Sequence, residues 1–469
     1  MAHEKKGQTA MESTSAPGPV SYEKSEADVL EKQTMRRVVR RLVVLLFFVY
    51  ILNYLDRTNI AIAKAEMAPA IGLTELAYGL GAGVFFIGYV LFEVPSNLVL
   101  YRVGARLWIT RIMVTWGLVA MAMSLVQGPV SFFVLRFLLG VAEAGLVPGV
   151  LLYLTGWVPS LRRARIIALF YLAVPVSTVV GAPLSGWLMG FSPFGFEGWR
   201  FMFFIEGLPC LFVAALVFFF LTDSPAQATW LSNKQRTWLT DSLRRETSEH
   251  GAGHPHSLKA AVKDPRVIGV AFAFFAMIVP LYALGFFLPT IVRQAGTFTN
   301  TQVGFITAVP YVVASMMMVL LSRRSDKSGK RFQYYVVPAL AGAGGLLLAA
   351  FTLGSYPAVA LVGFSIGAVG CISTLPVLWS VVPFMLSGVA AAGGIAFITA
   401  IGNIGGFVSP YLVALIRGDN ATLGTSSAAI AVNALFLVAA AISMFLVGRS
   451  LRKRTNMSTN ESSDVTADR

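Results

Sequence analysis

The chain has 469 residues, of which 56% are hydrophobic and 13% are charged, and its formal net charge is +14. Soluble proteins are about one quarter charged, so this composition excludes an ordinary soluble domain and indicates a chain that needs lipid as its solvent. The basic residues lie between apolar stretches and form no basic-aromatic motif, which favours a role in membrane orientation and argues against nucleic acid as a partner.

A polar stretch rich in Ser, Glu and Lys opens the chain, and we expect residues 1–41 to form a disordered cytoplasmic tail without a cleavable signal. Twelve apolar runs follow, each near the roughly 20 residues that a bilayer demands. The first six cover residues 42–63, 78–100, 107–127, 131–154, 166–189 and 200–221. The last six cover residues 267–292, 303–322, 333–353, 357–379, 389–416 and 427–448. The sequence therefore predicts an all-α membrane protein with 12 transmembrane helices.

A polar linker separates the sixth run from the seventh. It covers residues 222–266, and its segment Trp230 to Glu246 predicts an amphipathic helix. We therefore expect an N-terminal six-helix bundle over 42–221, a cytoplasmic linker loop, a C-terminal six-helix bundle over 267–448 and a cytoplasmic tail over 449–469. Cys210 and Cys371 lie inside apolar runs and the four histidines lie in polar segments, so we expect no disulfide, metal or cofactor.

Basic residues are distributed unequally between the two sides of the predicted membrane domain. One side, which includes both termini and the even-numbered loops, holds 31 of the 37 Lys and Arg residues. Basic loops stay in the cytoplasm, so we expect both termini to be cytoplasmic and the protein to be a multi-pass component of a plasma (inner) membrane.

A short basic loop recurs in the two halves of the chain. Residues 102–106, Arg-Val-Gly-Ala-Arg, follow the second run, and residues 327–331, Lys-Ser-Gly-Lys-Arg, follow the eighth, an offset of 225 residues. Parallel repeats of this kind are typical of transporters whose two halves rock about a central site.

Four charged residues stand inside otherwise uncharged runs: Asp56, Arg57, Arg136 and Glu143. Each costs roughly 2.5–3.5 kcal/mol on insertion scales, so these residues should pair with one another or face water. Arg136 and Glu143 are seven residues apart and therefore project from one helix face. We expect the four to form one mixed-sign cluster between the first and fourth spans. The structural alternative is that they are ion pairs that only hold these two spans in register.

The loop after the eighth span, Ser322 to Arg331, resembles the cytoplasmic signature of the major facilitator superfamily, and the loop at 101–106 is a more degenerate copy. This resemblance implies the major facilitator fold, with two six-helix bundles. It assigns a gating role to Arg102, Gly104, Arg106, Asp326, Lys327, Gly329 and Arg331.

Within that superfamily the chain is similar to the anion:cation symporter family, which includes bacterial tartrate, phthalate, hydroxyphenylacetate and galactonate permeases. The resemblance is carried by residues 53–60 (Asn-Tyr-Leu-Asp-Arg-Thr-Asn-Ile), 93–97, 136–145, 198–200, 204–207 and 403–406. It implies a monomer that carries a small organic anion together with protons. Galactonate-type permeases place proton-coupling acids at the positions of Asp56 and Glu143, which leaves Arg57 and Arg136 to contact or balance the anion.

Further polar and aromatic side chains are candidates for the binding cavity. Tyr50, Tyr54 and Arg57 share a helix face by their spacing, and Asn53 and Asn59 are expected to flank Asp56. The candidate substrate-binding residues are Arg57, Arg136, Tyr50, Tyr54, Asn59, Tyr89, Tyr282 and Asn403, with Tyr311 and Trp379 as weaker ones. Val174 stands where the galactonate-type permease carries a glutamine, which favours a less polar carboxylate, aromatic or a short diacid. Glu93 and Glu206 are interpreted as helix braces.

The predicted function is proton-coupled uptake of an organic carboxylate by alternating access. One alternative is an efflux antiporter of the same fold, for drugs or metabolites. Another is a transporter-like substrate sensor, which would need a larger cytoplasmic domain than this chain offers. An enzyme is disfavoured because no catalytic triad, metal cluster or phosphate loop is present, and a channel because no segment resembles a selectivity filter.

Overall fold

The structure, a computed structural model, describes residues 19–251, 263–382, 385 and 388–467. All regular secondary structure in this part of the chain is helical. The N-terminal half comprises α1 (Pro19–Val38), η1 (Val39–Val43), α2 (Val44–Thr58), α3 (Ile60–Ala70), α4 (Glu75–Val103), α5 (Ala105–Ala122), η2 (Met123–Leu125), α6 (Pro129–Glu143), α7 (Leu146–Thr155), α8 (Ser160–Tyr171), α9 (Ala173–Leu188), η3 (Pro193–Gly195) and α10 (Gly198–Phe220). The linker holds η4 (Pro225–Gln227) and α11 (Asn233–Gly251). The C-terminal half comprises α13 (Pro265–Gln294), α14 (Asn300–Ser328), α15 (Arg331–Thr352), α16 (Pro357–Ile372), α17 (Thr374–Val381), α18 (Gly388–Arg417) and α19 (Leu423–Ala467).

Twelve helical stretches of the described chain are long and apolar enough to cross a membrane, which confirms the predicted number of spans. Several of them are longer than the sequence predicted, because their helices continue past the apolar runs into polar residues, whereas the eleventh, residues 394–417, is shorter than the predicted 389–416. The first stretch, residues 28–70, adds polar turns before the apolar run that begins at Leu42, and the eighth extends to Ser328.

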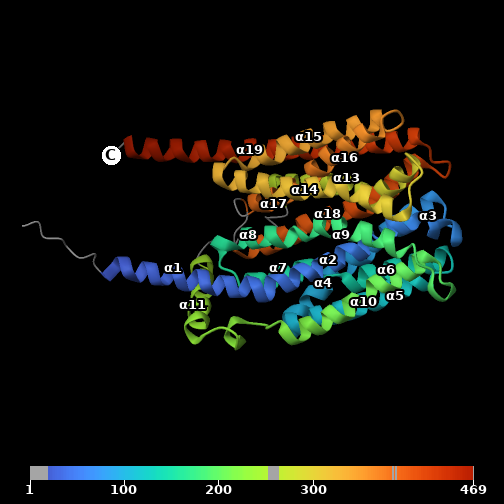
Figure 1. Ribbon diagram of the computed structural model, residues 1–469. Helices are drawn as coiled ribbons and strands as arrows, with labels where there is room; N and C mark the ends of the chain where they lie inside the picture. The colour runs from blue at the N-terminus through green and yellow to red at the C-terminus, as the bar shows by residue number, and fades with distance from the viewer. Residues whose placement is uncertain (1–18, 252–262, 383–384, 386–387, 468–469) are drawn as a thin grey trace, which may run out of the picture.

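The prediction of a disordered N-terminal tail is wrong for the residues that the structure describes. Residues 19–38 form α1, which runs through η1 into α2 and the first span (Figure 1). Thr34 and Met35 are buried, and Glu31 forms an ion pair with Arg162 of α8. The polar composition concealed this helix because its partners are other polar elements outside the apolar core. Residues 1–18 lie outside the described part.

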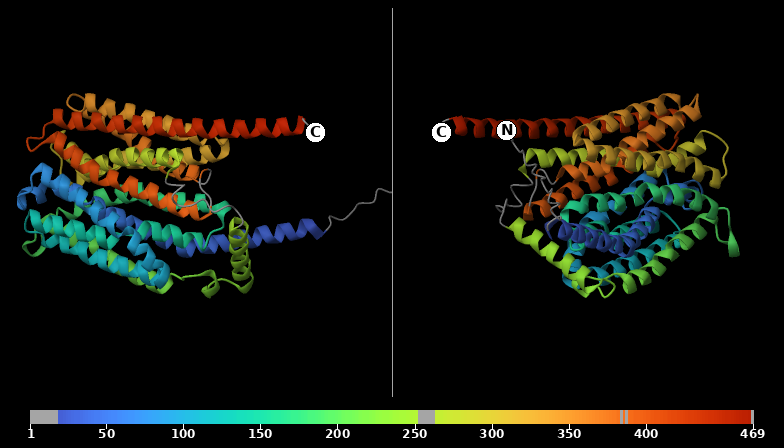
Figure 2. Two further views of the ribbon diagram at one scale, coloured as in Figure 1. Left: turned by 180° about the vertical axis from the view of Figure 1, so that it is seen from behind. Right: turned by 60° about the vertical axis from the view of Figure 1, so that its left-hand side comes forward.

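The helices form two groups, α2 to α10 and α13 to α19, which lie side by side with both described ends of the chain at the same end of the molecule (Figures 1 and 2). The groups meet along a seam where α4 packs against α18, α9 packs against α14, and α3 packs against α13. Glycines bring the backbones together there. A Cβ at Gly304 would stand 2.3 Å from the carbonyl oxygen of Ala182, so this contact between α14 and α9 requires glycine.

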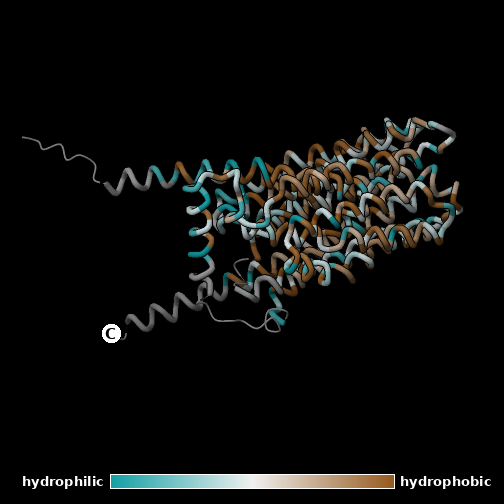
Figure 3. The backbone as a smooth tube through the Cα atoms, turned by 90° about the horizontal axis from the view of Figure 1, so that it is seen from below, coloured by the Kyte–Doolittle hydropathy of each residue, from teal (hydrophilic) through white to brown (hydrophobic). Residues whose placement is uncertain are grey.

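The predicted amphipathic linker helix is confirmed as α11. It lies across the end of the bundle beside α1, where hydrophilic residues gather, whereas hydrophobic residues run along the bundle itself (Figure 3). Leu231 and Leu239 are buried, and Trp230 stacks on Trp157 with ring centroids 5.6 Å apart. Gln235 of α11 accepts a hydrogen bond from Arg37, so the linker is fixed against α1.

The fourth span is broken near its middle, between Glu143 and Leu146. Gly145 produces this break with φ of 87°, a conformation that side chains with a Cβ rarely adopt. The turns at Asn59, Leu172 and Ser373 keep helical dihedral angles and backbone hydrogen bonds to the fourth residue before them, so those spans stay continuous. Discontinuous helices in a bilayer expose backbone groups, so they occur where protein or water can satisfy those groups, as at transport sites.

Candidate substrate and proton site

A buried ion pair joins the first and fourth spans. Arg57 Nη2 lies 2.8 Å from Glu143 Oε2, and both side chains are almost fully buried. Asn53 donates to the same carboxylate oxygen at 2.7 Å and accepts from Arg57 at 3.2 Å. The three side chains therefore form a closed triangle in which Glu143, at the end of α6, satisfies the guanidinium of α2.

Arg57 also reaches the other half of the molecule. Its Nη1 donates to the hydroxyl of Tyr282 on α13 at 3.2 Å. The two residues are 225 positions apart, the same offset as the two basic loops, so they occupy equivalent places in the two halves. Its guanidinium carbon lies 4.9 Å from the ring centroid of Phe85 and 5.2 Å from that of Tyr89. Such faces stabilise a buried cation without neutralising it.

Arg136 is the second arginine of this site, and it has no acid bonded to it within the described residues. It is fully buried and donates to the carbonyl oxygen of Ala82 at 3.4 Å, and its Nε and Nη1 find no partner in the part of the chain that the structure describes. Its guanidinium carbon lies 5.1 Å from the centroid of the Phe85 ring, which therefore contacts both arginines. A buried cation with unused donors is costly unless an anion completes it.

Asp56 lies apart from this cluster, so the prediction of a single group of four charged residues is wrong. Its Oδ2 accepts from Trp116 Nε1 of α5 at 2.7 Å and from Cys210 Sγ of α10 at 3.3 Å. Neighbouring residues on a helix point about 100° apart. Arg57 consequently faces α4, α6 and α13, whereas Asp56 faces α5 and α10.

The two asparagines of the first span divide between these faces. Asn53 belongs to the Arg57 side, which corrects the expectation that it flanks Asp56. Asn59 donates to Glu206 Oε2 at 3.0 Å, and Ser185 donates to Glu206 Oε1 at 2.6 Å. The structure therefore places Asn59 with Glu206 and away from the two arginines.

The remaining candidates surround Arg57 at different distances. Tyr54 stacks on Tyr282 with centroids 6.3 Å apart, so it stays close to the site. Tyr50 stacks instead on Phe170 at 4.5 Å. Asn403 donates to Glu93 Oε2 at 3.2 Å, which bridges α18 and α4 across the seam. Of the two weaker candidates, Tyr311 is buried and its hydroxyl has no partner among the described residues, and Trp379 packs edge-on against Phe274.

A glycine with positive φ ends the helix before each of the two basic loops, although its ψ differs between them. Gly104 and Gly329 both follow the end of a helix with positive φ, 97° and 68°. Asp223 accepts from the backbone N–H of Arg106 at 2.8 Å, and Arg331 donates to the carbonyl oxygen of Ser380 at 2.6 Å. Each loop is therefore tied to the end of another span. The other predicted loop residues, Arg102, Asp326 and Lys327, are exposed.

An ion-pair network at the end opposite the described termini was missed by the sequence analysis. Glu75 Oε1 lies 2.6 Å from Lys64 Nζ and 2.8 Å from Arg417 Nε, and these three side chains are 12%, 6% and 1% exposed. Arg417 belongs to the other half, so Glu75 bridges the seam. The backbone N–H of Glu75 also donates to Asp419 at 2.7 Å. Lys64 is 11 residues from Glu75, whereas Arg417 and Asp419 are more than 340 residues away, and no local sequence signal marks those two.

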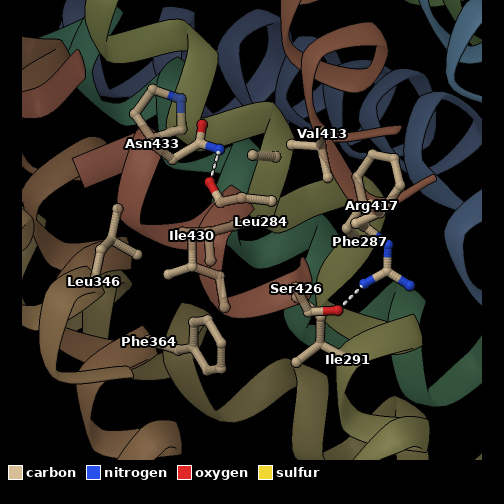
Figure 4. A pocket seen from close by; sticks show the side chains of 13 residues that line it. Leu284, Phe287, Ile291, Leu346, Phe364, Val413, Arg417, Ser426, Ile430 and Asn433 are labelled. Carbon is tan, nitrogen blue, oxygen red and sulfur yellow. Dashed lines mark hydrogen bonds between the residues drawn. The ribbon is translucent and has the colours of Figure 1, made fainter. Parts of the chain in front are cut away.

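An apolar cavity lies beside Arg417 inside the C-terminal half (Figure 4). Leu284, Phe364 and Ile430 line it, Arg417 donates to Ser426 at one end, and Asn433 lies at the other. Its free volume is about 20 Å³, which suffices for one water. It is far smaller than a site for an organic ligand, which occupies roughly 300 Å³ or more.

Comparison of the sequence with known proteins identifies the family to which this fold belongs. The sequence profile of the Major Facilitator Superfamily matches residues 46–410. A protein of Agrobacterium vitis named as a tartrate transporter is 43% identical over 425 residues, which cover 90% of this chain and 93% of that protein. A quinolone resistance transporter of Acinetobacter baumannii is 38% identical, with 82% of this chain and 89% of that protein covered.

Solved structures agree on the fold. The inward-facing, unoccupied structure of a bacterial homologue of the human lysosomal transporter Spinster matches with a TM-score of 0.72 at 19% identity, and it covers 88% of this chain and 97% of that one. Both the profile and the relatives are those of transporters, and they confirm the predicted fold class and the prediction that the chain is not an enzyme. The chain is therefore a multi-pass membrane transporter that belongs to the Major Facilitator Superfamily.

Proposed function

We propose that this transporter couples the uptake of an organic carboxylate to protons that move in the same direction. The observation that carries the proposal is the contact of Arg57 with both Glu143 and, through Tyr282, the opposite half of the molecule. Arg57 thereby contacts both a carboxylate that can bind a proton and the interface along which the two halves move. Arg136 beside it has unused donors that fit an anion.

The proposed cycle follows from the competition for Arg57. While Glu143 is ionised, it satisfies Arg57, and an incoming carboxylate has to displace it. Protonation of Glu143 removes that charge, so Arg57 becomes available to the anion together with Arg136. Movement of the halves about the bound anion then changes the side to which the site opens, since Arg57 and Tyr282 belong to different halves. Loss of the proton restores the ion pair and releases the anion.

The surroundings of Arg57 favour a small carboxylate with a flat or apolar body. Phe85, Phe86 and Tyr89 lie at its guanidinium, and Tyr282 packs edge-on against Phe86 with centroids 4.7 Å apart. Val174 is buried on α9 and offers no hydrogen bond. The A. vitis relative is named for tartrate, a short diacid, so the proposed class comprises aromatic monocarboxylates and short dicarboxylates.

We also propose that the protein works as a monomer in a bacterial plasma membrane with both termini in the cytoplasm. The bias of basic residues toward the side of the termini supports this orientation. In that orientation the network of Glu75 closes the extracellular end, and α11 and the basic loops lie at the cytoplasmic end. The proposed domains are the two bundles at 42–221 and 267–448, with the linker at 222–266 between them.

Proton movement driven by substrate tests the proposal. Energy-depleted cells that express the protein are challenged with tartrate, phthalate, hydroxyphenylacetate, nicotinate and galactonate while the pH of the medium is recorded. Symport predicts alkalinisation with one acid, and its loss in Asp56→Asn and Glu143→Gln. If all five acids leave the pH unchanged, although the protein is present in the membrane and accumulates one of them, the proposal of symport is wrong.

The second candidate is efflux in exchange for protons, which the identity with the quinolone resistance transporter favours. Quinolones carry a carboxylate, so Arg136 has a ligand in both candidates and the direction of transport separates the two. Quinolone tolerance and accumulation are compared in cells with and without the protein. Raised tolerance with lowered accumulation would favour efflux, whereas unchanged tolerance would favour uptake.

A further inference from the structure

A second buried carboxylate lies between α2 and α10, on the opposite side of α2 from the Arg57 cluster. Glu206 is 3% exposed and accepts from Asn59 and Ser185. One helical turn further along, Asp56 of α2 accepts from Cys210 of α10. Each helix thus supplies one carboxylate and one neutral donor, and the two acids occupy successive turns of the same contact.

Within the described chain, no basic side chain takes part in the hydrogen bonds of Glu206 and Asp56. To this stretch of α10, α2 presents Asp56, α5 presents Trp116 and α9 presents Ser185. Lys64, on the neighbouring α3, is paired with Glu75. An ionised carboxylate in a bilayer is costly without a cation, so Glu206 is more stable with a proton than without one.

A small cavity connects this carboxylate to the seam. Asn59 and Thr178 line it from the N-terminal half and Thr307 lines it from α14 of the other half, and Ser185 also lines it. Asn59 Oδ1, Thr178 Oγ1 and Thr307 Oγ1 have no partner within the described residues, and all three side chains are at least nine-tenths buried. The free volume is about 20 Å³, and a water with two to four polar partners fits such a space.

We propose that Glu206 is a further proton-binding residue beside Asp56 and Glu143, and that it exchanges its proton with the seam through Ser185 and a water held by Asn59, Thr178 and Thr307. Ser185 touches both the carboxylate and the cavity. A proton that enters from the seam binds the water, the water passes a proton to Ser185 Oγ, and the Ser185 hydroxyl proton passes to Glu206 Oε1, so that the water and the serine both end neutral. Asn59 keeps its bond to Oε2 throughout. Because Thr307 belongs to α14, separation of the halves opens the cavity and admits the proton.

The role of this proton in transport rests on the proposed symport. The test therefore measures protonation of the Glu206 carboxyl group directly, without any substrate. Infrared difference spectra of the purified protein in lipid record the C=O stretch of protonated carboxylic acids as the buffer is stepped from alkaline to acidic. We expect Glu206→Gln to lose one titrating band that Asp56→Asn and Glu143→Gln both retain. Identical titrating bands in Glu206→Gln and the wild type would overturn the proposal.

A second pair of variants tests the route and leaves Glu206 in place. Ser185→Ala removes the relay, whereas Ser177→Ala removes a buried hydroxyl of the same helix that is bonded to the carbonyl oxygen of Ile51. We expect hydrogen–deuterium exchange of the Glu206 band to slow roughly tenfold in the first variant, since one hydrogen-bonded link is lost. It should stay at the wild-type rate in the second. Equal exchange rates in both variants would overturn the route, and a failure of symport would leave these spectra unaffected.

Discussion

Replacement of Glu75 by glutamine should weaken closure of the end of the bundle opposite the described termini, which is extracellular in the proposed orientation. The substitution removes the negative charge that bridges Lys64 and Arg417. The Arg417 side chain is only 1% exposed, so this ion pair is buried. Removal of one partner from a buried pair costs about 3–5 kcal/mol. Of the two ion pairs only the one with Arg417 crosses the seam, and the bond from the Glu75 backbone to Asp419, which also crosses it, is retained. We therefore expect about half of that cost to act on closure, roughly 1.5–2.5 kcal/mol, or about 10- to 60-fold in the closed-to-open ratio.

The rate at which a buried cysteine is labelled measures this ratio. Thr307→Cys places a thiol on the seam, where the native side chain is 3% exposed, and a charged thiol reagent added from outside reaches it only when the halves part there. The parent protein, with buried Cys210 and Cys371, gives the background. Labelling should accelerate at least tenfold in the Glu75→Gln background, since about 1.4 kcal/mol corresponds to a factor of ten.

A matched substitution controls for the loss of any glutamate at this end. Glu197→Gln breaks an exposed ion pair with Arg200, i to i+3 within the N-terminal half, which is worth little. It should leave the labelling rate unchanged. The same small effect from Glu75→Gln would refute the reasoning that the bridge across the seam holds this end closed.

Three other substitutions have distinct expected results. Tyr282→Phe removes a hydrogen bond to a charged group, so kcat/KM for the anion should fall roughly tenfold. The control is Tyr335→Phe, which should retain wild-type kinetics because the Tyr335 hydroxyl bonds within the C-terminal half. Arg136→Gln should raise KM and also raise the melting temperature, because it removes a buried unpaired charge; a lower melting temperature with unchanged KM would contradict its role. Gly140→Ala places a Cβ 1.9 Å from a backbone oxygen of α4 and should lower thermal stability by about 1–3 kcal/mol, while Gly354→Ala meets no atom within 4 Å and should not.

Much of the fold follows from the sequence because a bilayer imposes one rule on every span. Each span has to be apolar and near 20 residues long, so hydropathy locates twelve of them. The ends of the helices do not follow from that rule. Residues 19–38 are polar, and they form a helix because they contact other polar elements, including Arg162 of α8 and Gln235 of α11.

The candidate site was predictable in part. The pairing of Arg57 with Glu143 follows from charge inside spans that pack together, and the structure brings these two into contact. The direction in which Asp56 points depends on which helices flank the first span, and that arrangement is not encoded locally. Glu75 lies outside the predicted second span. Its role as a bridge between the halves is recognisable only from the structure, in which Arg417 lies beside it.

In the proposed cycle Glu143 carries the coupling proton and thereby releases Arg57 to the anion. Glu143→Gln imitates the protonated state and keeps the shape of the side chain. In proteoliposomes loaded with the acid that the proton-movement panel identifies, we expect this variant to retain counterflow exchange of labelled for unlabelled acid and to lose uptake driven by a proton gradient. Equal loss of exchange and of gradient-driven uptake, in protein that is folded and inserted, would show that Glu143 does not act as the coupling residue.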